Sequence, residues 1–176
     1  MATAPIFLIG YRGTGKTTVA RLVARRLGRE SIDADAEIER RAGKLIAAIF
    51  ADDGEPAFRE IEAAVVRDLA QTRLVVSTGG GAILREANRA AMQAAGPIVW
   101  LTAGVDTIAK RIAADAATAR LRPNLTAAGG RTEIEAVLAA RTPIYRACAT
   151  FEVDTENKTP AAVADEILAK LPHPPG

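Results

Sequence analysis

Residues 10–17, GYRGTGKT, have the residue types and the spacing of a phosphate-binding loop. The segment follows a short apolar run at residues 6–9 and precedes a stretch of helical period, which is the context such a loop requires. Glycines let successive backbone N–H groups turn toward phosphate oxygens, and the start of the helix adds partial positive charge. Lys16 can reach the terminal phosphates, and the Thr17 hydroxyl can bind Mg²⁺. We therefore predict a nucleotide site formed by Gly13, Thr14, Gly15, Lys16, Thr17 and Thr18.

Such a loop commonly works with an acid at the end of a later apolar strand. The obvious strand, LVVS, ends in Ser77, which argues against a motor or a switch protein. Asp33 and Asp35, in SIDADAEIE, supply carboxylates elsewhere. In an extended chain they share one face, and at the carboxyl end of a strand both would point into the ligand crevice. One could hold Mg²⁺ and the other could accept the proton of an attacking hydroxyl, although a solvated turn that caps the next helix explains this segment equally well.

Three further features suggest a second pocket for a small acidic acceptor. Arg59 and Glu62 lie three residues apart on a predicted helix. They form either a surface ion pair or a pair in which Glu62 fixes the planar guanidinium of Arg59 so that it faces an anion. The sequence STGGGAIL puts three glycines after a strand, where a ligand can approach the backbone closely unless they form an ordinary loop. Arg141 follows on a late helix in LAARTPIYR. Together they favour a hydroxylated organic acid as the phosphoryl acceptor.

The elements that must position these residues alternate along the chain. Short apolar runs predict strands at residues 6–9, at a weak segment ending at Asp33, and at 74–77, 98–101 and 150–153. Helical periodicity predicts helices at residues 17–27, 61–69, 131–147 and 160–171. Strands that alternate with helices indicate a three-layer α/β sandwich with a five-stranded parallel sheet. We expect one domain over residues 1–171 and a disordered tail at 172–176.

Residues 112–130 do not fit this pattern, because they are rich in alanine, then polar, and end in Gly-Gly. They form either a plain surface loop or a mobile lid, since long loops in compact domains are often functional. Arg120 and Arg122 are the lid residues that could reach a phosphate.

Composition excludes several classes of protein. The 176 residues are 49% hydrophobic and 25% charged, and the net charge of +2 is too small to argue for binding to nucleic acid or a membrane. The single cysteine, Cys148, cannot form an internal disulfide and is expected to be a small packing residue. With no signal peptide or apolar span in view, we expect a cytoplasmic protein.

At this point the chain resembles the shikimate kinase family over nearly its whole length. The matching elements are the loop at residues 10–17, the Asp-Ala-Asp of 33–35, GEPAFREIE at 54–62, the glycines at 79–81, Arg122-Pro, and RTPIY at 141–145. The resemblance implies a P-loop kinase of the nucleoside-monophosphate-kinase type, with a substrate-binding helical region at about 33–62 and a lid at about 112–130. It also implies transfer of the ATP γ-phosphoryl group to the 3-hydroxyl of shikimate, in the pathway to chorismate and the aromatic amino acids.

Site residues follow from the resemblance position by position. It implies that Asp35, Lys16 and Arg122 are catalytic, with Asp35 as the base, and that Thr17 and Asp33 support Mg²⁺. It places shikimate against Asp35, Arg59, Gly80, Gly81 and Arg141, with Glu62 orienting Arg59. It adds Arg111, Arg122 and Lys158 to the ATP-binding residues. The lid departs from the family in reading Arg-Pro-Asn-Leu at 122–125 rather than Arg-Pro-Leu-Leu.

Two other interpretations remain beside this one. The first is another small-molecule P-loop kinase, such as a gluconate or nucleoside monophosphate kinase, against which FREIE and the triple glycine argue. The second is a non-catalytic nucleotide-binding homologue, against which the complete set of motif residues argues. A monomer is the expectation from the family.

Overall fold

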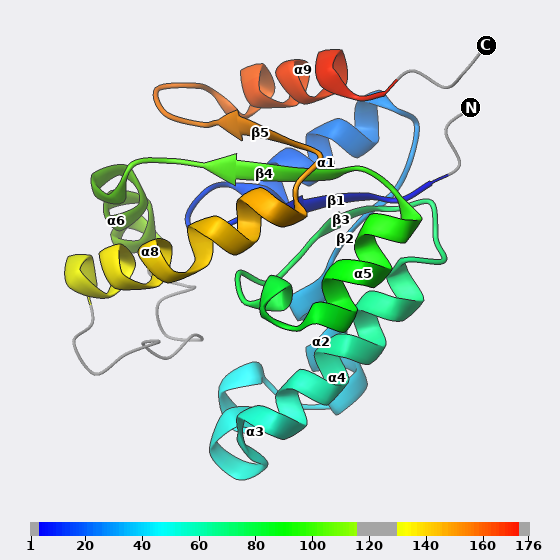
Figure 1. Cartoon of the computed structure of the whole chain (residues 1–176), viewed down its shortest axis with the longest axis vertical. Coiled ribbons are helices and arrows are strands. Elements are labelled where there is room, and N and C mark those ends of the chain that lie inside the picture. Colours follow the sequence, from blue (N-terminus) through cyan, green and yellow to red (C-terminus); the bar gives the residue numbers. More distant parts are fainter. Residues whose placement is uncertain (1–3, 116–129, 173–176) are drawn as a thin grey trace.

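The computed structural model describes residues 4–115 and 130–172. Within these residues five strands form one parallel sheet in the order β2-β3-β1-β4-β5 (Figure 1). The strands are β1 Ile6–Ile9, β2 Ser31–Asp33, β3 Val75–Ser77, β4 Ile98–Thr102 and β5 Phe151–Asp154. The predicted five-stranded parallel sheet is therefore confirmed, and each predicted strand is present within a residue or two of its expected bounds.

Helices pack on both faces of the sheet. They are α1 Lys16–Arg26, α2 Ala34–Ala42, α3 Ile46–Asp52, α4 Gly54–Leu69, α5 Glu86–Ala95, α6 Val105–Ala114, α8 Gly130–Cys148 and α9 Pro160–Lys170, with a short 3₁₀ turn at Ala82–Leu84. Figure 1 shows α1 and α9 on one side of the strands and α4 and α5 on the other. The helix predicted at residues 61–69 is the second half of the longer α4, and the three-layer α/β arrangement is confirmed.

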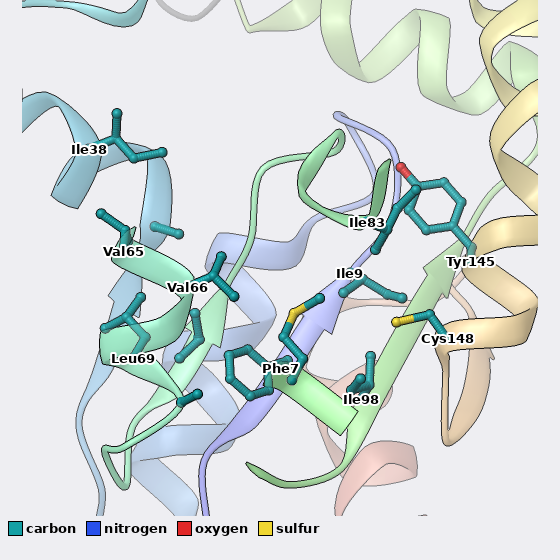
Figure 2. Close-up of a cluster of buried hydrophobic side chains, with 14 of the residues drawn as sticks. Phe7, Ile9, Ile38, Val65, Val66, Leu69, Ile83, Ile98, Tyr145 and Cys148 are labelled. Carbon is teal, nitrogen blue, oxygen red and sulfur yellow. The ribbon is translucent and has the colours of Figure 1, made fainter. Parts of the chain in front are cut away.

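Both faces of the central strand β1 are buried, which is why it reads as an unbroken apolar run. Phe7 and Ile9 face the cluster beneath α4, α5 and α8, whereas Ile6 and Leu8 face the cluster beneath α1 and α9. Figure 2 shows the first cluster, in which Phe7, Ile9 and Ile98 lie among side chains from α4 and α8.

Cys148 lies at the end of α8 in this same cluster, and only 3% of its surface is exposed. Burial raises the pKa of its thiol, which disfavours the nucleophilic thiolate. The prediction that Cys148 is a packing residue agrees with this environment.

The sheet register brings the carboxyl ends of three strands together. Asp33 at the end of β2 pairs with Ser77 at the end of β3, and Ser77 pairs with Leu8 of β1. The phosphate loop begins directly after β1, so it opens beside both strand ends. The strand register alone therefore places Asp33, at the end of β2, next to the phosphate loop.

Residues 33–62, the predicted substrate-binding region, span the end of β2, α2, α3 and the first half of α4. Figure 1 shows α2, α3 and the start of α4 extending away from the sheet at the bottom of the view. The rings of Phe50 and Phe58 pack with their centroids 4.7 Å apart and their planes tilted by 35°, and this contact holds α3 against α4.

The predicted lid at residues 112–130 lies largely outside the described residues, as does the end of the predicted tail. Its flanks are described: α6 ends at Ala114, α8 begins at Gly130, and the two helices pack through Ile108 and Ile134 beside Tyr11. No helix within the described ranges is both long and apolar enough to cross a membrane.

Candidate active site

Glycine is required at two points of the phosphate loop. A Cβ on Gly10, where φ is 139°, would lie 2.5 Å from the carbonyl oxygen of Leu101. Gly15 is the N-cap of α1 and adopts a left-handed conformation with φ of 88°. Thr14 is buried, and its hydroxyl donates to the Tyr11 carbonyl at 2.8 Å, so this side chain shapes the loop from within.

Lys16 lies at the base of the loop and is 8% exposed. Its ammonium donates to the carbonyl oxygens of Gly10 and Tyr11, at 2.8 and 3.0 Å. The charge is therefore held inside the curve of the loop, at the wall of the cavity that the loop encloses.

Thr17, Asp33 and Ser77 form a cluster of oxygen atoms beside the loop. The Thr17 hydroxyl donates to Asp33 Oδ2 at 2.6 Å and lies 3.2 Å from the Ser77 hydroxyl. Hard oxygen ligands of this kind suit Mg²⁺, which is usually held by one or two protein groups, water and phosphate oxygens. In the described part of the chain no group of three or more His, Cys, Asp or Glu could hold a metal ion.

Both interpretations of the Asp33–Asp35 segment find support in the structure. Asp33 Oδ1 caps α2 by accepting from the backbone N–H groups of Asp35 and Ala36, at 3.0 and 3.4 Å. Its other oxygen accepts from Thr17. Asp33 is thus both the N-cap of α2 and a member of the oxygen cluster beside the phosphate loop. Asp35 lies in the first turn of α2 and lines the cavity.

Asp35 also lies against the glycine loop that follows β3. A Cβ on Gly79 would lie 2.6 Å from Asp35 Oδ1 and 3.6 Å from Glu62 Oε1. The absence of a side chain at Gly79 therefore creates the space in which the Asp35 carboxylate sits.

Arg59 on α4 is fixed by acids from its own helix. Its guanidinium donates to Glu62 Oε2 at 2.8 Å, to Glu55 at 3.2–3.3 Å and to the Gly81 carbonyl at 3.3 Å. The Glu62 side chain is 3% exposed, so this is a largely buried pair rather than the surface pair that the sequence also allowed. Burial raises the pKa of Glu62, and the neighbouring Arg59 offsets only part of that rise.

The glycine loop meets α8 at Gly80. A Cβ on Gly80 would lie 3.6 Å from Arg141 Nη1, and the Tyr145 hydroxyl donates to the Gly80 carbonyl at 2.5 Å. A Cβ on Gly81 would lie 2.9 Å from both terminal nitrogens of Arg59. Gly80 and Gly81 thus let two arginines from different helices approach one short stretch of backbone.

A cavity of about 220 Å³ lies between these elements. Its lining includes most residues predicted at the nucleotide site, together with both acids of the β2 end. They are Gly13, Gly15, Lys16, Thr17, Thr18, Asp33, Asp35 and Arg111. Arg59, Gly80, Gly81 and Arg141 do not line this cavity; they adjoin it across Gly79 and Asp35. The described residues therefore form one cavity at the phosphate loop, which we call the donor compartment, and beside it a group made of Arg59, Gly80, Gly81 and Arg141, which we call the acceptor compartment. Asp35 lines the cavity and lies against Gly79, between the two.

The remaining predicted ATP-binding residues differ in their placement. Arg111 on α6 bridges the Gly13 carbonyl, at 3.3 Å, and Thr155 after β5, at 2.9 Å. Lys158 is not among the residues that line the cavity, and its ammonium pairs with Glu166 of α9 at 2.7 Å. The contact of Lys158 with ATP stays a prediction. Arg122 and the alternative Arg120 lie outside the described residues.

The sequence interpretation assigned no role to Arg12 or Tyr145. Arg12 lines the cavity, and Tyr145 carries the α8 contact with Gly80. A signal for Arg12 was present, because it stands inside the phosphate loop itself. Tyr145 had two signals: it ends the RTPIY motif at 141–145, and it lies four residues after Arg141 on the same helix.

Comparison with known proteins agrees with this geometry. The family model described as shikimate kinase matches residues 12–172. The shikimate kinase of Thermobifida fusca (strain YX) is 45% identical over 174 residues, which covers 98% of either chain. That of Rhodopirellula baltica is 42% identical over 95% of this chain and 90% of its own length.

A solved shikimate kinase from Acinetobacter baumannii, in complex with shikimate, is 36% identical and superposes with a TM-score of 0.88. The superposition covers 95% of this chain and 92% of that one. The fold, the phosphate loop and these relatives agree, and the chain belongs to the shikimate kinase family of ATP-dependent kinases.

Proposed function

We propose that this chain transfers the γ-phosphoryl group of ATP to the 3-hydroxyl of shikimate, with Asp35 as the base, giving shikimate 3-phosphate and ADP. The observation that carries the proposal is the position of Asp35. Its carboxylate lines the cavity of the phosphate loop and also lies against the glycine loop, beyond which stand Arg59 and Arg141. One carboxylate therefore faces both the donor and the acceptor.

In the donor half, the phosphate loop and the start of α1 surround the ATP phosphates with N–H donors and the Lys16 ammonium. Arg111 ties the loop to the chain after β5, beside which the nucleoside would lie. Arg122 is the lid residue proposed to meet the phosphates, on the resemblance of Arg122-Pro to the family motif.

Thr17 and Asp33 would hold Mg²⁺, Thr17 through its hydroxyl and Asp33 through bound water. The ion would neutralise charge on the β- and γ-phosphates. What supports this assignment is the oxygen cluster of Thr17, Asp33 and Ser77, which lines the same cavity as Lys16.

In the acceptor half, Arg59 and Arg141 would bind the carboxylate of shikimate. Arg59 suits this role because Glu62 and Gly81 fix its plane while its side chain keeps 20% of its surface exposed. Asp35 then accepts the proton of the 3-hydroxyl as that oxygen bonds to the γ-phosphorus and the bond from phosphorus to the ADP oxygen breaks.

Release of ADP in a coupled assay with ATP, MgCl₂ and shikimate tests the reaction. The panel of acceptors should include gluconate and the nucleoside monophosphates, because these define the rival kinases. We expect rapid ADP release with shikimate as the acceptor and not with the other acceptors of the panel. Turnover with another acceptor instead would assign a different kinase, and no turnover with any acceptor would leave a nucleotide-binding homologue.

We also propose that the enzyme acts as a cytoplasmic monomer. The single cysteine suits a reducing compartment, and the monomer is the expectation from the family. Light scattering after size exclusion tests the oligomeric state; a stable dimer at micromolar concentration would refute the monomer.

A further inference from the structure

Arg12 is a charged residue in an unusual place, inside the phosphate loop. It lines the same cavity as three residues of the proposed mechanism, Lys16, Thr17 and Asp35. Its Nη2 lies 3.7 Å from Glu133 Oε1, and Glu133 comes from the first turn of α8. The Glu133 side chain has no exposed surface, whereas that of Arg12 is 19% exposed.

This ion pair does not use the donors of Arg12 fully. A separation of 3.7 Å is an electrostatic contact and not a hydrogen bond. Arg12 Nε is buried and has no hydrogen-bond partner within the residues that the structure describes. A buried N–H donor without an acceptor is costly, and in native proteins such groups usually have a partner that ligand or water supplies. The guanidinium is thus held near Glu133, and because 19% of the Arg12 side chain is exposed and the residue lines the cavity, its outer nitrogens can still meet an anion there.

The position of Glu133 on α8 relates this pair to the acceptor compartment. Glu133 lies in the first turn of α8, and Arg141 and Tyr145 lie further along the same helix. Arg141 Nη1 lies 3.6 Å from the Cβ position of Gly80, Tyr145 donates to the Gly80 carbonyl, and the backbone nitrogen of Arg12 lies 3.7 Å from the same Cβ position. Helix α8 is therefore held both to the phosphate loop, through Arg12, and to the glycine loop. Arg12 stands between the two compartments.

We propose that Arg12 contacts the phosphoryl group as it passes from ATP to the acceptor hydroxyl, and that Glu133 is the positioning residue that holds the guanidinium there. The inference rests on the proposed function and adds to it. In the transition state the charge of the transferred group lies on its equatorial oxygens, where a fixed planar donor stabilises it more than in the bound substrates. Arg12 would supply such donors from within the loop.

Steady-state kinetics of Arg12→Ala test the contact. We expect kcat to fall about 100-fold, with the KM values for ATP and shikimate changed by less than about threefold, because the interaction is made mainly in the transition state. Arg21→Ala, at an exposed position of α1, is the matched control and should behave as wild type. A raised KM for shikimate with unchanged kcat would place Arg12 in carboxylate binding and overturn the proposal, as would unchanged kinetics.

Glu133→Gln tests the positioning role, because it removes the charge and keeps the shape. We expect kcat to fall about tenfold in the wild-type background and by less than about twofold in the Arg12→Ala background, since the effect of Glu133 on turnover passes through Arg12. If Glu133 were only structural, Glu133→Gln would lower the melting temperature and reduce kcat equally in both backgrounds. That result would overturn the positioning role of Glu133. If wild type itself releases no ADP with shikimate, the proposed function fails; if wild type turns over and Arg12→Ala equals it, only this inference fails.

Discussion

Thr17 and Asp33 lie sixteen residues apart in the sequence and are joined by a 2.6 Å hydrogen bond from the Thr17 hydroxyl to Asp33 Oδ2. The bond links the first turn of α1 to the end of β2, two elements that meet only because β2 pairs with β3 next to β1. The other oxygen of Asp33 caps α2. A single carboxylate therefore fixes both the phosphate loop and the helix that carries Asp35.

Asp33→Asn separates these two roles, because asparagine is as good an N-cap as aspartate but lacks its charge. We expect the free energy of unfolding to change by less than about 0.5 kcal/mol, while the Mg²⁺ concentration that gives half-maximal activity rises about tenfold or more. Urea unfolding and a Mg²⁺ titration of ADP release measure the two effects. Asp33→Ala adds loss of the cap, at about 1 kcal/mol. An unchanged Mg²⁺ requirement in both variants would show that Asp33 has no part in metal binding.

Asp35→Asn tests the base. The substitution keeps the size of the side chain and its position in the first turn of α2, but it removes the proton acceptor. We expect kcat to fall by about 10²–10⁴-fold with nearly unchanged ATP affinity. Rapid-quench measurement of a single turnover, together with calorimetric titration of ATP, gives both values. Turnover near the wild-type rate would show that another group accepts the proton.

Gly79 and Gly81, which flank Gly80 in the glycine loop, allow the compartments to be tested independently. A methyl group on Gly79 would press on Asp35, and one on Gly81 would press on Arg59, at 2.6 and 2.9 Å. Both neighbours are side-chain ends that can move, so we expect stability to change little. Gly79→Ala should lower kcat about tenfold or more, and Gly81→Ala should mainly raise the KM for shikimate, because displacing a catalytic or binding group by about 1 Å is costly.

Gly104→Ala is the control for these two variants, since its Cβ would lie 3.4 Å from the movable Glu156 carboxylate, in ordinary contact. Kinetic constants within twofold of wild type are expected for it. If Gly79→Ala and Gly81→Ala change the same constant, the separation into donor and acceptor compartments at Asp35 is wrong.

The sequence predicted those parts of the fold and site that depend on local pattern. The strand β1, the phosphate loop and α1 follow from one apolar run, spaced glycines and helical period, and all three are where expected. The parallel sheet follows from the alternation of elements. Other contacts do not follow from local pattern. The spacing of Arg59 and Glu62 allowed their ion pair but not its burial, and the hydrogen bond from Thr17 to Asp33 depends on tertiary packing.

Two charged side chains show what local pattern leaves out. Lys158 was predicted to bind ATP, and in the structure its ammonium pairs with Glu166, eight residues further on. Arg12 received no role because its partner, Glu133, is on the far side of the lid segment in the sequence. Long-range ion pairs decide where flexible charged side chains point, and periodicity carries no information about them.

Arg59→Lys tests the carboxylate site. Lysine keeps the charge but loses the planar fork that Glu62 and Gly81 fix in place. We expect the KM for shikimate to rise about 10- to 100-fold with a smaller change in kcat, because bidentate binding of a carboxylate is lost. Arg40→Lys, whose guanidinium pairs with Glu37 on the exposed side of α2, is the matched control and should leave both constants unchanged. Unchanged affinity for shikimate by calorimetry in Arg59→Lys would exclude a carboxylate contact.

Tyr145→Phe removes the donor that joins α8 to Gly80. At neutral pH we expect a loss of about 1–2 kcal/mol in the free energy of unfolding, because the Gly80 carbonyl loses a buried hydrogen bond. The KM for shikimate should rise as the glycine loop loosens. Thermal and urea unfolding measure the first effect, and steady-state kinetics measure the second.

The same tyrosine predicts a pH dependence. Burial raises the pKa of Tyr145 from 10.0 to about 12, although Arg141 acts in the opposite direction. Between pH 10 and 12 the unfolded chain therefore loses this proton while the folded chain keeps it, which stabilises the unfolded state. The stability of wild type should fall relative to Tyr145→Phe by up to about 1.4 kcal/mol per pH unit in this window and not below it. Lysines and arginines titrate alike in both proteins and cancel in the difference. Parallel stability curves from pH 8 to 12 would show that Tyr145 keeps an ordinary pKa.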